Sequence, residues 1–214
     1  MRQQSIAFNS KNNTLEGIIS IPNGSPKNVP AVLLGHPHPI FGGSMSSTVL
    51  QLISTTLDSC GLATMRFNFR GTGNSQGSFD QGKGEQDDLK AAWDVLRRWP
   101  GIDNRKLGLM GISFSSSVAL GCIDKMKGIA GLCIVSPTEN SILRVPLDKI
   151  KCPKLVITGS EDKISKWDSV QNALDSVSPK TQFKVIEDAD HNWTDKEDEL
   201  ASIVSQFFSA SIIV

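Results

Sequence analysis

The sequence predicts an α/β fold, with a mostly parallel sheet, an antiparallel N-terminal hairpin and helices on both faces. Short apolar runs alternate along the chain with stretches whose apolar residues recur at helical spacing. At the N-terminus, two alternating stretches flank the polar turn 10–13. We expect one domain over residues 1–214, because single α/β domains of this length are common.

The elements follow one another in a regular order. Residues 4–9 and 14–21 form the expected hairpin, and residues 31–34 are apolar without alternation, as in a strand buried on both faces. Residues 70–84 are rich in Gly, Ser and Asn and are typical of a loop. The remaining strands are expected at 62–69, 106–111, 129–135, 154–159 and 181–187, and the helices at 45–59, 85–99, 114–126, 165–177 and 195–209.

Composition excludes several classes of protein. Lys+Arg and Asp+Glu number 22 each, so no surplus positive charge can neutralise phosphates, and we expect no nucleic-acid partner. No secretory signal begins the chain and no apolar run approaches the roughly 18 residues that span a bilayer, so we expect a cytoplasmic protein without a membrane partner. The four cysteines lack metal-binding spacing and are expected to be free thiols, and composition leaves the oligomeric state open.

A nucleophile is predicted at Ser113. Gly111-Ile112-Ser113-Phe114-Ser115 lies between an apolar strand and a helix, which is the setting of a nucleophile elbow. In this tight turn, small residues on either side of the serine let the backbone pass close to its neighbours. Ser115 stands where the elbow pattern has a second glycine. Taken alone, the five residues fit a helix N-cap as well as a nucleophile.

The base and the acid follow later strands. A serine hydroxyl needs a base to take its proton, and His191 follows the last expected strand. The acid should follow the preceding strand, where Asp162 is the first choice and Glu161 the alternative. Asp188 and Asp190 are too close to His191 in sequence to orient its ring. The chain order Ser113, Asp162, His191 is the one that this kind of elbow requires.

The oxyanion formed during acyl transfer needs two N–H donors. One is expected from Phe114, directly after the nucleophile, and the other from the loop after strand 31–34. Two prolines in that loop lack an N–H, which leaves His38 as the first choice and Ile40 as the second. His36 and His38 make a poor zinc set without a nearby Cys or carboxylate, so we expect no metal and give His36 a structural role.

These residues resemble the small, lidless α/β-hydrolases of the dienelactone-hydrolase-like superfamily, predicted to be carboxylic ester hydrolases. The resemblance rests on Gly35-His36-Pro37-His38-Pro39, on the stretch 66–77 and on the elbow, and it extends through Gly159-Ser160-Glu161-Asp162 to Asp190-His191. It implies an α/β-hydrolase fold and a Ser113-His191-Asp162 triad. True dienelactone hydrolases are similar in fold but use cysteine as nucleophile. The short stretch 136–153, where lipases often insert a cap, implies no substantial lid domain.

We therefore expect a serine hydrolase that cleaves carboxylic esters through an acyl-enzyme, without a cofactor. Its substrate would be a small-molecule ester or thioester, and thioesterase and amidase activities share the same chemistry. The main alternative is a non-catalytic scaffold or binding protein with the same fold. A nucleotide site at Gly77–Gly84 is disfavoured, because Gly84 stands where a phosphate-binding loop carries Ser or Thr, and no strand directly precedes it.

Overall fold

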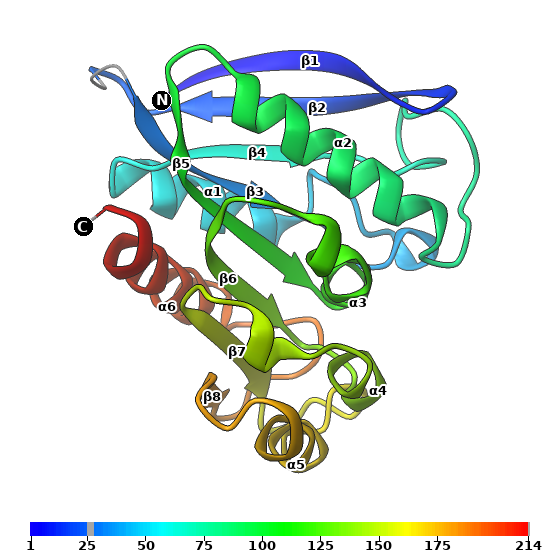
Figure 1. The fold of residues 1–214 in the computed structure, drawn as a ribbon, viewed down its shortest axis with the longest axis vertical. Coiled ribbons are helices and arrows are strands. Elements are labelled where there is room, and N and C mark those ends of the chain that lie inside the picture. The colour runs from blue at the N-terminus through cyan, green and yellow to red at the C-terminus, as the bar shows by residue number, and fades with distance from the viewer. Residues whose placement is uncertain (25–27, 214) are drawn as a thin grey trace.

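The computed structural model describes residues 1–24 and 28–213, whose strands form one eight-stranded sheet (Figure 1). The strand order is β1-β2-β4-β3-β5-β6-β7-β8. β1 pairs antiparallel with β2, and β2 pairs antiparallel with β4, whereas all other neighbours are parallel. The strands are Arg2–Ser10, Asn13–Ile21, Val29–Leu34, Ala63–Phe67, Ile102–Ile112, Ile129–Val135, Lys154–Gly159 and Gln182–Ile186, in chain order. The predicted hairpin and mostly parallel sheet are confirmed.

Helices cover both faces of the sheet, as expected for a parallel sheet. One core contains buried residues of α2, α3 and α5, and the other contains those of α1 and α6. The helices are α1 (Thr48–Ser59), α2 (Gly84–Arg98), α3 (Phe114–Cys122), α4 (Glu139–Leu143), α5 (Trp167–Val177) and α6 (Glu197–Phe208). None of the helices in the described ranges has both the length and the apolarity to cross a membrane.

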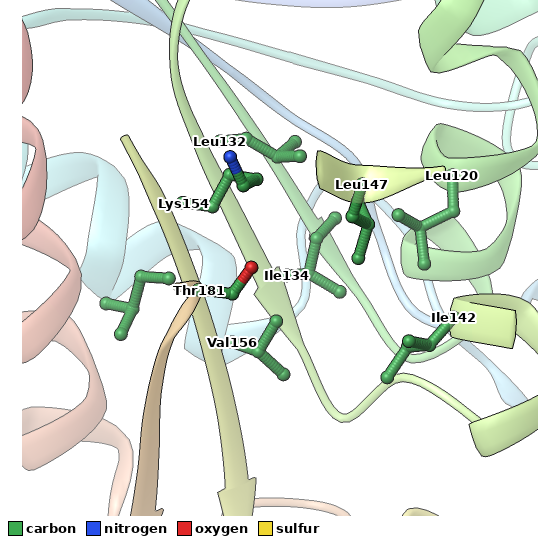
Figure 2. A pocket seen from close by; sticks show the side chains of 9 residues that line it. Leu120, Leu132, Ile134, Ile142, Leu147, Lys154, Val156 and Thr181 are labelled. Carbon is green, nitrogen blue, oxygen red and sulfur yellow. The ribbon is translucent and has the colours of Figure 1, made fainter. Parts of the chain in front are cut away.

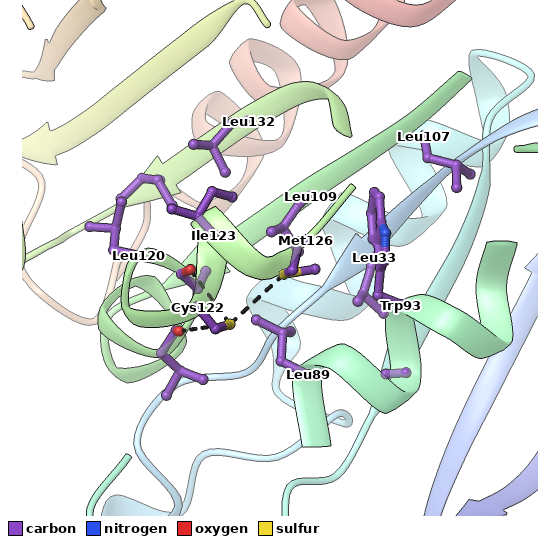
Figure 3. Packing of buried hydrophobic residues seen from close by; sticks show 14 of the residues in the cluster. Leu33, Leu89, Trp93, Leu107, Leu109, Leu120, Cys122, Ile123, Met126 and Leu132 are labelled. Atoms are coloured by element: carbon purple, nitrogen blue, oxygen red, sulfur yellow. Dashed lines mark hydrogen bonds between the residues drawn. The ribbon is translucent and has the colours of Figure 1, made fainter. Parts of the chain in front are cut away.

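An apolar core lies beneath α2 and α3. Figure 3 shows Leu89 and Trp93 of α2 packed near Leu109 of β5 and Cys122 of α3. The Cys122 thiol donates to the Val118 carbonyl at 3.3 Å, and burial raises its pKa to about 12. Cys122 therefore behaves as a small apolar side chain. All four cysteines are free thiols in the structure.

Hydrogen bonds of nearby side chains set where β5 begins and where β4 ends, and the apolar pattern of the sequence did not predict these two bounds. β5 begins at Ile102 and not at 106, because the Asp103 carboxylate accepts the backbone N–H and the guanidinium of Arg105 and holds this polar stretch extended. β4 ends at Phe67 and not at 69, because the Phe69 N–H turns away to the His36 ring.

The stretch 136–153 packs against the molecule and does not form a lid domain. It contains α4 and the single turn η3 (Leu147–Lys149), neither of which the sequence predicted. Ile142 and Leu147 project toward Leu120 of α3 and Ile134 of β6, around a narrow apolar crevice (Figure 2). The stretch is thus anchored in the core beside α3.

Candidate active site

Ser113 lies in a strained turn between β5 and α3. Its backbone has φ 54° and ψ −112°, a conformation that few residues other than glycine adopt. The turn is held because the Ser113 N–H donates to the Val135 carbonyl at 2.9 Å, and the Ser116 N–H donates to the Ser113 carbonyl at 3.0 Å. A Cβ on Gly111 would lie 2.6 Å from the Ser115 carbonyl oxygen. A glycine is therefore required at this position, two residues before Ser113.

Ser115, which replaces the second glycine of the elbow pattern, is accommodated without distortion of its hydrogen bonding. Its buried hydroxyl accepts the Ile112 N–H at 2.8 Å and donates to the Ile112 carbonyl at 3.0 Å. Gly35, at the end of β3, provides the space for this side chain. A Cβ added to Gly35 would lie 2.7 Å from the Ser115 Cβ and 2.9 Å from its Oγ, and the nearest atom of any other residue, the Met110 carbonyl oxygen, is 3.6 Å away.

Gly35 and Ser115 are therefore expected to be coupled. Gly35→Ala should lower the free energy of unfolding by about 1–3 kcal/mol through overpacking. Adding Ser115→Gly removes the clashing atoms and should restore most of that loss. A double-mutant cycle by chemical denaturation measures the coupling, with Ser115→Gly alone as control. Equal instability of Gly35→Ala with and without Ser115→Gly would show that this contact is not the cause.

The side chains of Ser113, His191 and Asp162 form a continuous chain of hydrogen bonds. Ser113 Oγ lies 2.8 Å from His191 Nε2, and His191 Nδ1 lies 2.9 Å from both carboxylate oxygens of Asp162. Asp162 Oδ1 also accepts the N–H groups of Ile164 at 2.9 Å and Ser165 at 2.7 Å. Burial opposes ionisation of Asp162, but the bonds from His191 and Ser165 outweigh it and lower the pKa of the carboxyl group. Asp162 is thus held as a carboxylate facing the imidazole.

Neither Glu161, the alternative acid, nor the nearby Asp190 forms a hydrogen bond with the His191 ring. The Glu161 side chain is exposed, and its backbone N–H donates to the Ala189 carbonyl at 3.0 Å. The Asp190 carboxylate is bonded within its own turn, where Oδ1 accepts the N–H groups of Asn192 at 3.0 Å and Thr194 at 2.9 Å. The structure therefore brings Asp162 to the histidine and not Glu161.

The loops that carry Asp162 and His191 are bonded to each other. The Ser160 N–H donates to the Ile186 carbonyl at 2.9 Å, and the Asp188 N–H donates to the Ser160 hydroxyl at 2.9 Å. Gly159 lies so close to this second loop that a Cβ there would overlap the Ala189 carbonyl oxygen. These contacts fix the acid and the histidine relative to one another.

The loop after β3 is compact and aromatic. The His38 carbonyl accepts the N–H groups of Phe41 at 3.1 Å and Gly43 at 3.0 Å. The His38 ring packs 4.9 Å from the ring of Phe114 and 5.1 Å from that of Phe79, measured between centroids. Burial lowers the pKa of His38, and the Glu85 carboxylate only partly offsets this effect.

The two expected oxyanion donors line the same cleft as Ser113. In the described ranges, the backbone N–H groups of Phe114 and His38 donate to no protein acceptor. The Ile40 N–H, the second choice, instead donates to His38 Nδ1 at 3.3 Å. Of the two alternatives, His38 is the one whose amide is available.

His36 joins the loops after β3 and β4, as its expected structural role required. Its fully buried ring accepts the Phe69 N–H at Nε2, 3.1 Å away, and its Nδ1 lies 2.6 Å from the Pro37 carbonyl. Since Nε2 accepts, Nδ1 carries the proton and donates to Pro37. Burial lowers the pKa of His36 to about 4, so the ring is neutral at physiological pH.

This histidine should make the fold acid-sensitive. The pKa of His36 is lower in the folded chain than in the unfolded chain, so the unfolded chain binds an extra proton between about pH 6.5 and 4. The free energy of unfolding should fall by about 3 kcal/mol as the pH drops through this window, and His36 should contribute no further loss below it. Denaturant titrations at several pH values, compared between wild type and His36→Gln, isolate this contribution. Parallel pH profiles for the two proteins would contradict it.

A cleft of about 770 Å³ opens over the Ser113 and His191 side chains. Its walls come from the His38 loop, the start of α3 and the two bonded loops, and Phe41 and Ile164 lie at the rim with 85% and 64% of their surface exposed. A small molecule can therefore reach Ser113 directly from solvent.

The glycine-rich stretch 77–84 is unsuited to phosphate. The N–H groups of Asp80 and Gly82 donate to the Glu85 carboxylate at 2.7 and 2.9 Å, and the Gly84 N–H donates to the Asp80 carboxylate at 3.0 Å. The amides that would cradle a phosphate are occupied by carboxylates, and the nearby negative charge would repel it.

Sequence reasoning missed the residues that position the loops bearing Asp162 and His191. Ser160 and Ser165 carry no local signal for their long-range bonds, although the Ser165 hydroxyl donates to the Pro137 carbonyl at 2.5 Å. The Asp190 turn did carry a local signal, because an Asp followed closely by Asn192 and Thr194 is typical of a side-chain-capped turn. Trp193, buried in that turn, anchors the loop that bears His191.

Comparison with known proteins assigns the family. A model of the alpha/beta hydrolase domain matches residues 30–207. An uncharacterised protein of Rickettsia prowazekii is 30% identical over 210 residues, covering 94% of this chain and 87% of its own. An alpha-beta serine hydrolase homologue from Coxiella burnetii is 30% identical with a TM-score of 0.84, covering 96% of this chain and 97% of its own.

A lidless serine hydrolase from Xanthomonas campestris is 27% identical with a TM-score of 0.83, covering 98% of this chain and 94% of its own. These similarities extend over nearly the whole chain. They confirm the predicted resemblance to lidless α/β-hydrolases. The chain belongs to the α/β-hydrolase domain family.

Proposed function

We propose that the protein is a serine esterase that cleaves carboxylic esters of small molecules through an acyl-enzyme. The observation that carries this proposal is the unbroken hydrogen-bond chain from Ser113 Oγ through the His191 ring to the Asp162 carboxylate, at 2.8 and 2.9 Å. A non-catalytic scaffold has no use for this geometry in an open cleft.

In the proposed reaction, Ser113 Oγ attacks the acyl carbon and His191 Nε2 takes its proton. The carbonyl oxygen becomes an oxyanion, which the N–H groups of Phe114 and His38 stabilise. As the tetrahedral intermediate collapses, the bond to the leaving group breaks and His191 returns the proton to it. Water then attacks the Ser113 ester by the same route, and the acid product and free Ser113 are released. Asp162 keeps the proton on Nδ1 throughout and stabilises the imidazolium.

A fluorophosphonate probe and a short-chain p-nitrophenyl ester test the proposal together. We expect one covalent adduct per chain, mapped to Ser113 by mass spectrometry, and release of p-nitrophenol by the unlabelled protein. Prior labelling should abolish turnover, whereas heat-unfolded protein should not react. Folded protein that neither takes the label nor hydrolyses the ester would favour the scaffold. Parallel assays with a thioester and an anilide of the same acyl group compare the three leaving groups.

A further inference from the structure

The large apolar side chains that are exposed in the described ranges gather at one edge of the sheet. Two of them lie near the ends of the chain, and the others lie in segments that follow parallel strands, at the edge that also carries Ser113. These others are Ile40, Phe41, Leu143, Ile164 and Trp167. Exposed apolar side chains that are scattered singly need no explanation, but a group of them around one cleft indicates an apolar ligand.

Two members of this group, Phe41 and Ile164, line the cleft itself. Phe41 follows β3 and Ile164 follows β7, whereas Ser113 follows β5, which lies between those two strands in the sheet (Figure 1). The two apolar side chains therefore lie on opposite sides of the nucleophile. Because both are largely exposed, a ligand lying over Ser113 can remove apolar surface of both from water.

The side of the cleft that carries Phe41 is aromatic. The Phe41 ring lies 5.0 Å from the His38 ring, which lies 4.9 Å from the ring of Phe114, measured between centroids. All three residues line the cleft, and Phe114 directly follows Ser113. We call this row of rings, from the rim to the nucleophile, the aromatic wall. Rings attract other rings in edge-to-face or offset contact, beyond the effect of the area that they bury.

The lining of the cleft offers no partner to an anionic substrate group. Neither lysine nor arginine occurs among its lining residues in the described ranges, and Glu197 is the one carboxylate. Glu197 forms no ion pair with any other described residue. An anionic group that entered the cleft would lose hydration without gaining a cationic side chain, which is unfavourable. The lining therefore favours an uncharged ester.

We propose that the cleft selects uncharged esters with an aromatic acyl group, which packs against the aromatic wall while the alcohol part contacts Ile164. In the proposed reaction, His191 returns its proton to the alcohol oxygen, so the alcohol part lies on the side of the His191 loop. That loop is bonded to the one that carries Asp162 and Ile164. The acyl group then extends to the other side, toward Phe41. Phe41 and Ile164 are specificity-determining residues, and this inference rests on the proposed function.

Two ester series on the full-length protein test the two sides of the cleft separately. In the first series the alcohol is p-nitrophenol, and the acyl group is acetyl, cyclohexylacetyl or phenylacetyl, so that the larger two match in size and differ in aromaticity. In the second series the acyl group is acetyl, and the alcohol is methanol, butanol or 3-methylbutanol, followed by acid release with a pH indicator. We expect kcat/KM to rise along each series in the order given. A 4-carboxyphenylacetyl ester should react more slowly than its carboxamide.

Variants at the rim assign each preference to a side chain. Phe41→Ala should lower the ratio of kcat/KM for the phenylacetyl ester to that for the acetyl ester by about three- to tenfold, and leave the alcohol series unchanged. Phe41→Leu should reduce the preference for phenylacetyl over cyclohexylacetyl and keep that for cyclohexylacetyl over acetyl. Ile164→Ala should instead flatten the alcohol series by about two- to fivefold. Ile40→Ala, at an equally exposed isoleucine that does not line the cleft, should change neither ratio.

Several results would overturn the inference and leave the esterase proposal standing. They are equal turnover across the acyl series, faster hydrolysis of the carboxylate member than of its carboxamide, and an exchange of the effects of Phe41→Ala and Ile164→Ala. A change in the sedimentation coefficient of Phe41→Ala with its acyl preference intact would also overturn it, because the rim would then serve contact between copies of the chain. Failure of every ester to react would instead count against the proposed function.

Discussion

Replacing Ser113 with Ala should lower kcat on a p-nitrophenyl ester by on the order of 10⁶. The change removes the hydroxyl that is proposed to form the acyl-enzyme, while the proposed oxyanion donors, the amides of Phe114 and His38, remain. The remaining activity should therefore reflect direct attack by water and should show no burst of p-nitrophenol. Steady-state and pre-steady-state assays measure both quantities.

Ser116→Ala is the matched control for this change. Its buried hydroxyl lies 2.6 Å from the Val135 carbonyl and 2.9 Å from the Gly111 carbonyl, and its single proton is available to one of them at a time, so the hydroxyl should affect stability and not the chemical step. A Ser113→Ala protein with wild-type turnover would disprove the assignment of the nucleophile.

Replacing Asp162 with Asn should lower kcat by about 10⁴ with the fold intact. Oδ1 accepts the N–H groups of Ile164 and Ser165, so the amide oxygen of the new side chain must occupy that position. Its NH₂ group then points at His191 Nδ1, which has to become an acceptor. The proton moves to Nε2, where the ring can no longer take a proton from Ser113.

Glu161→Gln is the matched control for Asp162→Asn, because Asp162 bonds to the imidazole and the neighbouring Glu161 does not. We expect Glu161→Gln to retain kcat, because its side chain is exposed and the N–H that fixes the loop belongs to the backbone. A large loss in Glu161→Gln with little effect of Asp162→Asn would reverse the assignment of the acid. The tautomer itself can be observed from the ring nitrogen shifts of His191 by NMR.

The residues that meet at the cleft were predictable because each follows a parallel strand. Ser113, Asp162 and His191 come after β5, β7 and β8, and the carboxyl ends of parallel strands lie along one edge of the sheet. The short helix α4 was not predictable from periodicity, because five residues are too few to establish a 3.6-residue repeat. The long-range bonds were also hidden. That Ser160 meets Asp188, or that Gly35 makes room for Ser115, depends on which strands are neighbours and at what register.

The bonds between the Asp162 and His191 loops join the proposed acid and the proposed base in one cooperative unit. Both loops extend from the β7–β8 pair, and β8 is the edge strand, paired only with β7 in the described sheet. An opening that releases β8 breaks the Ser160 and Glu161 contacts in the same event and frees the acid together with the base. Activity would then be switched off as a whole by fraying of the sheet edge, well before the core around β3 and β5 is lost.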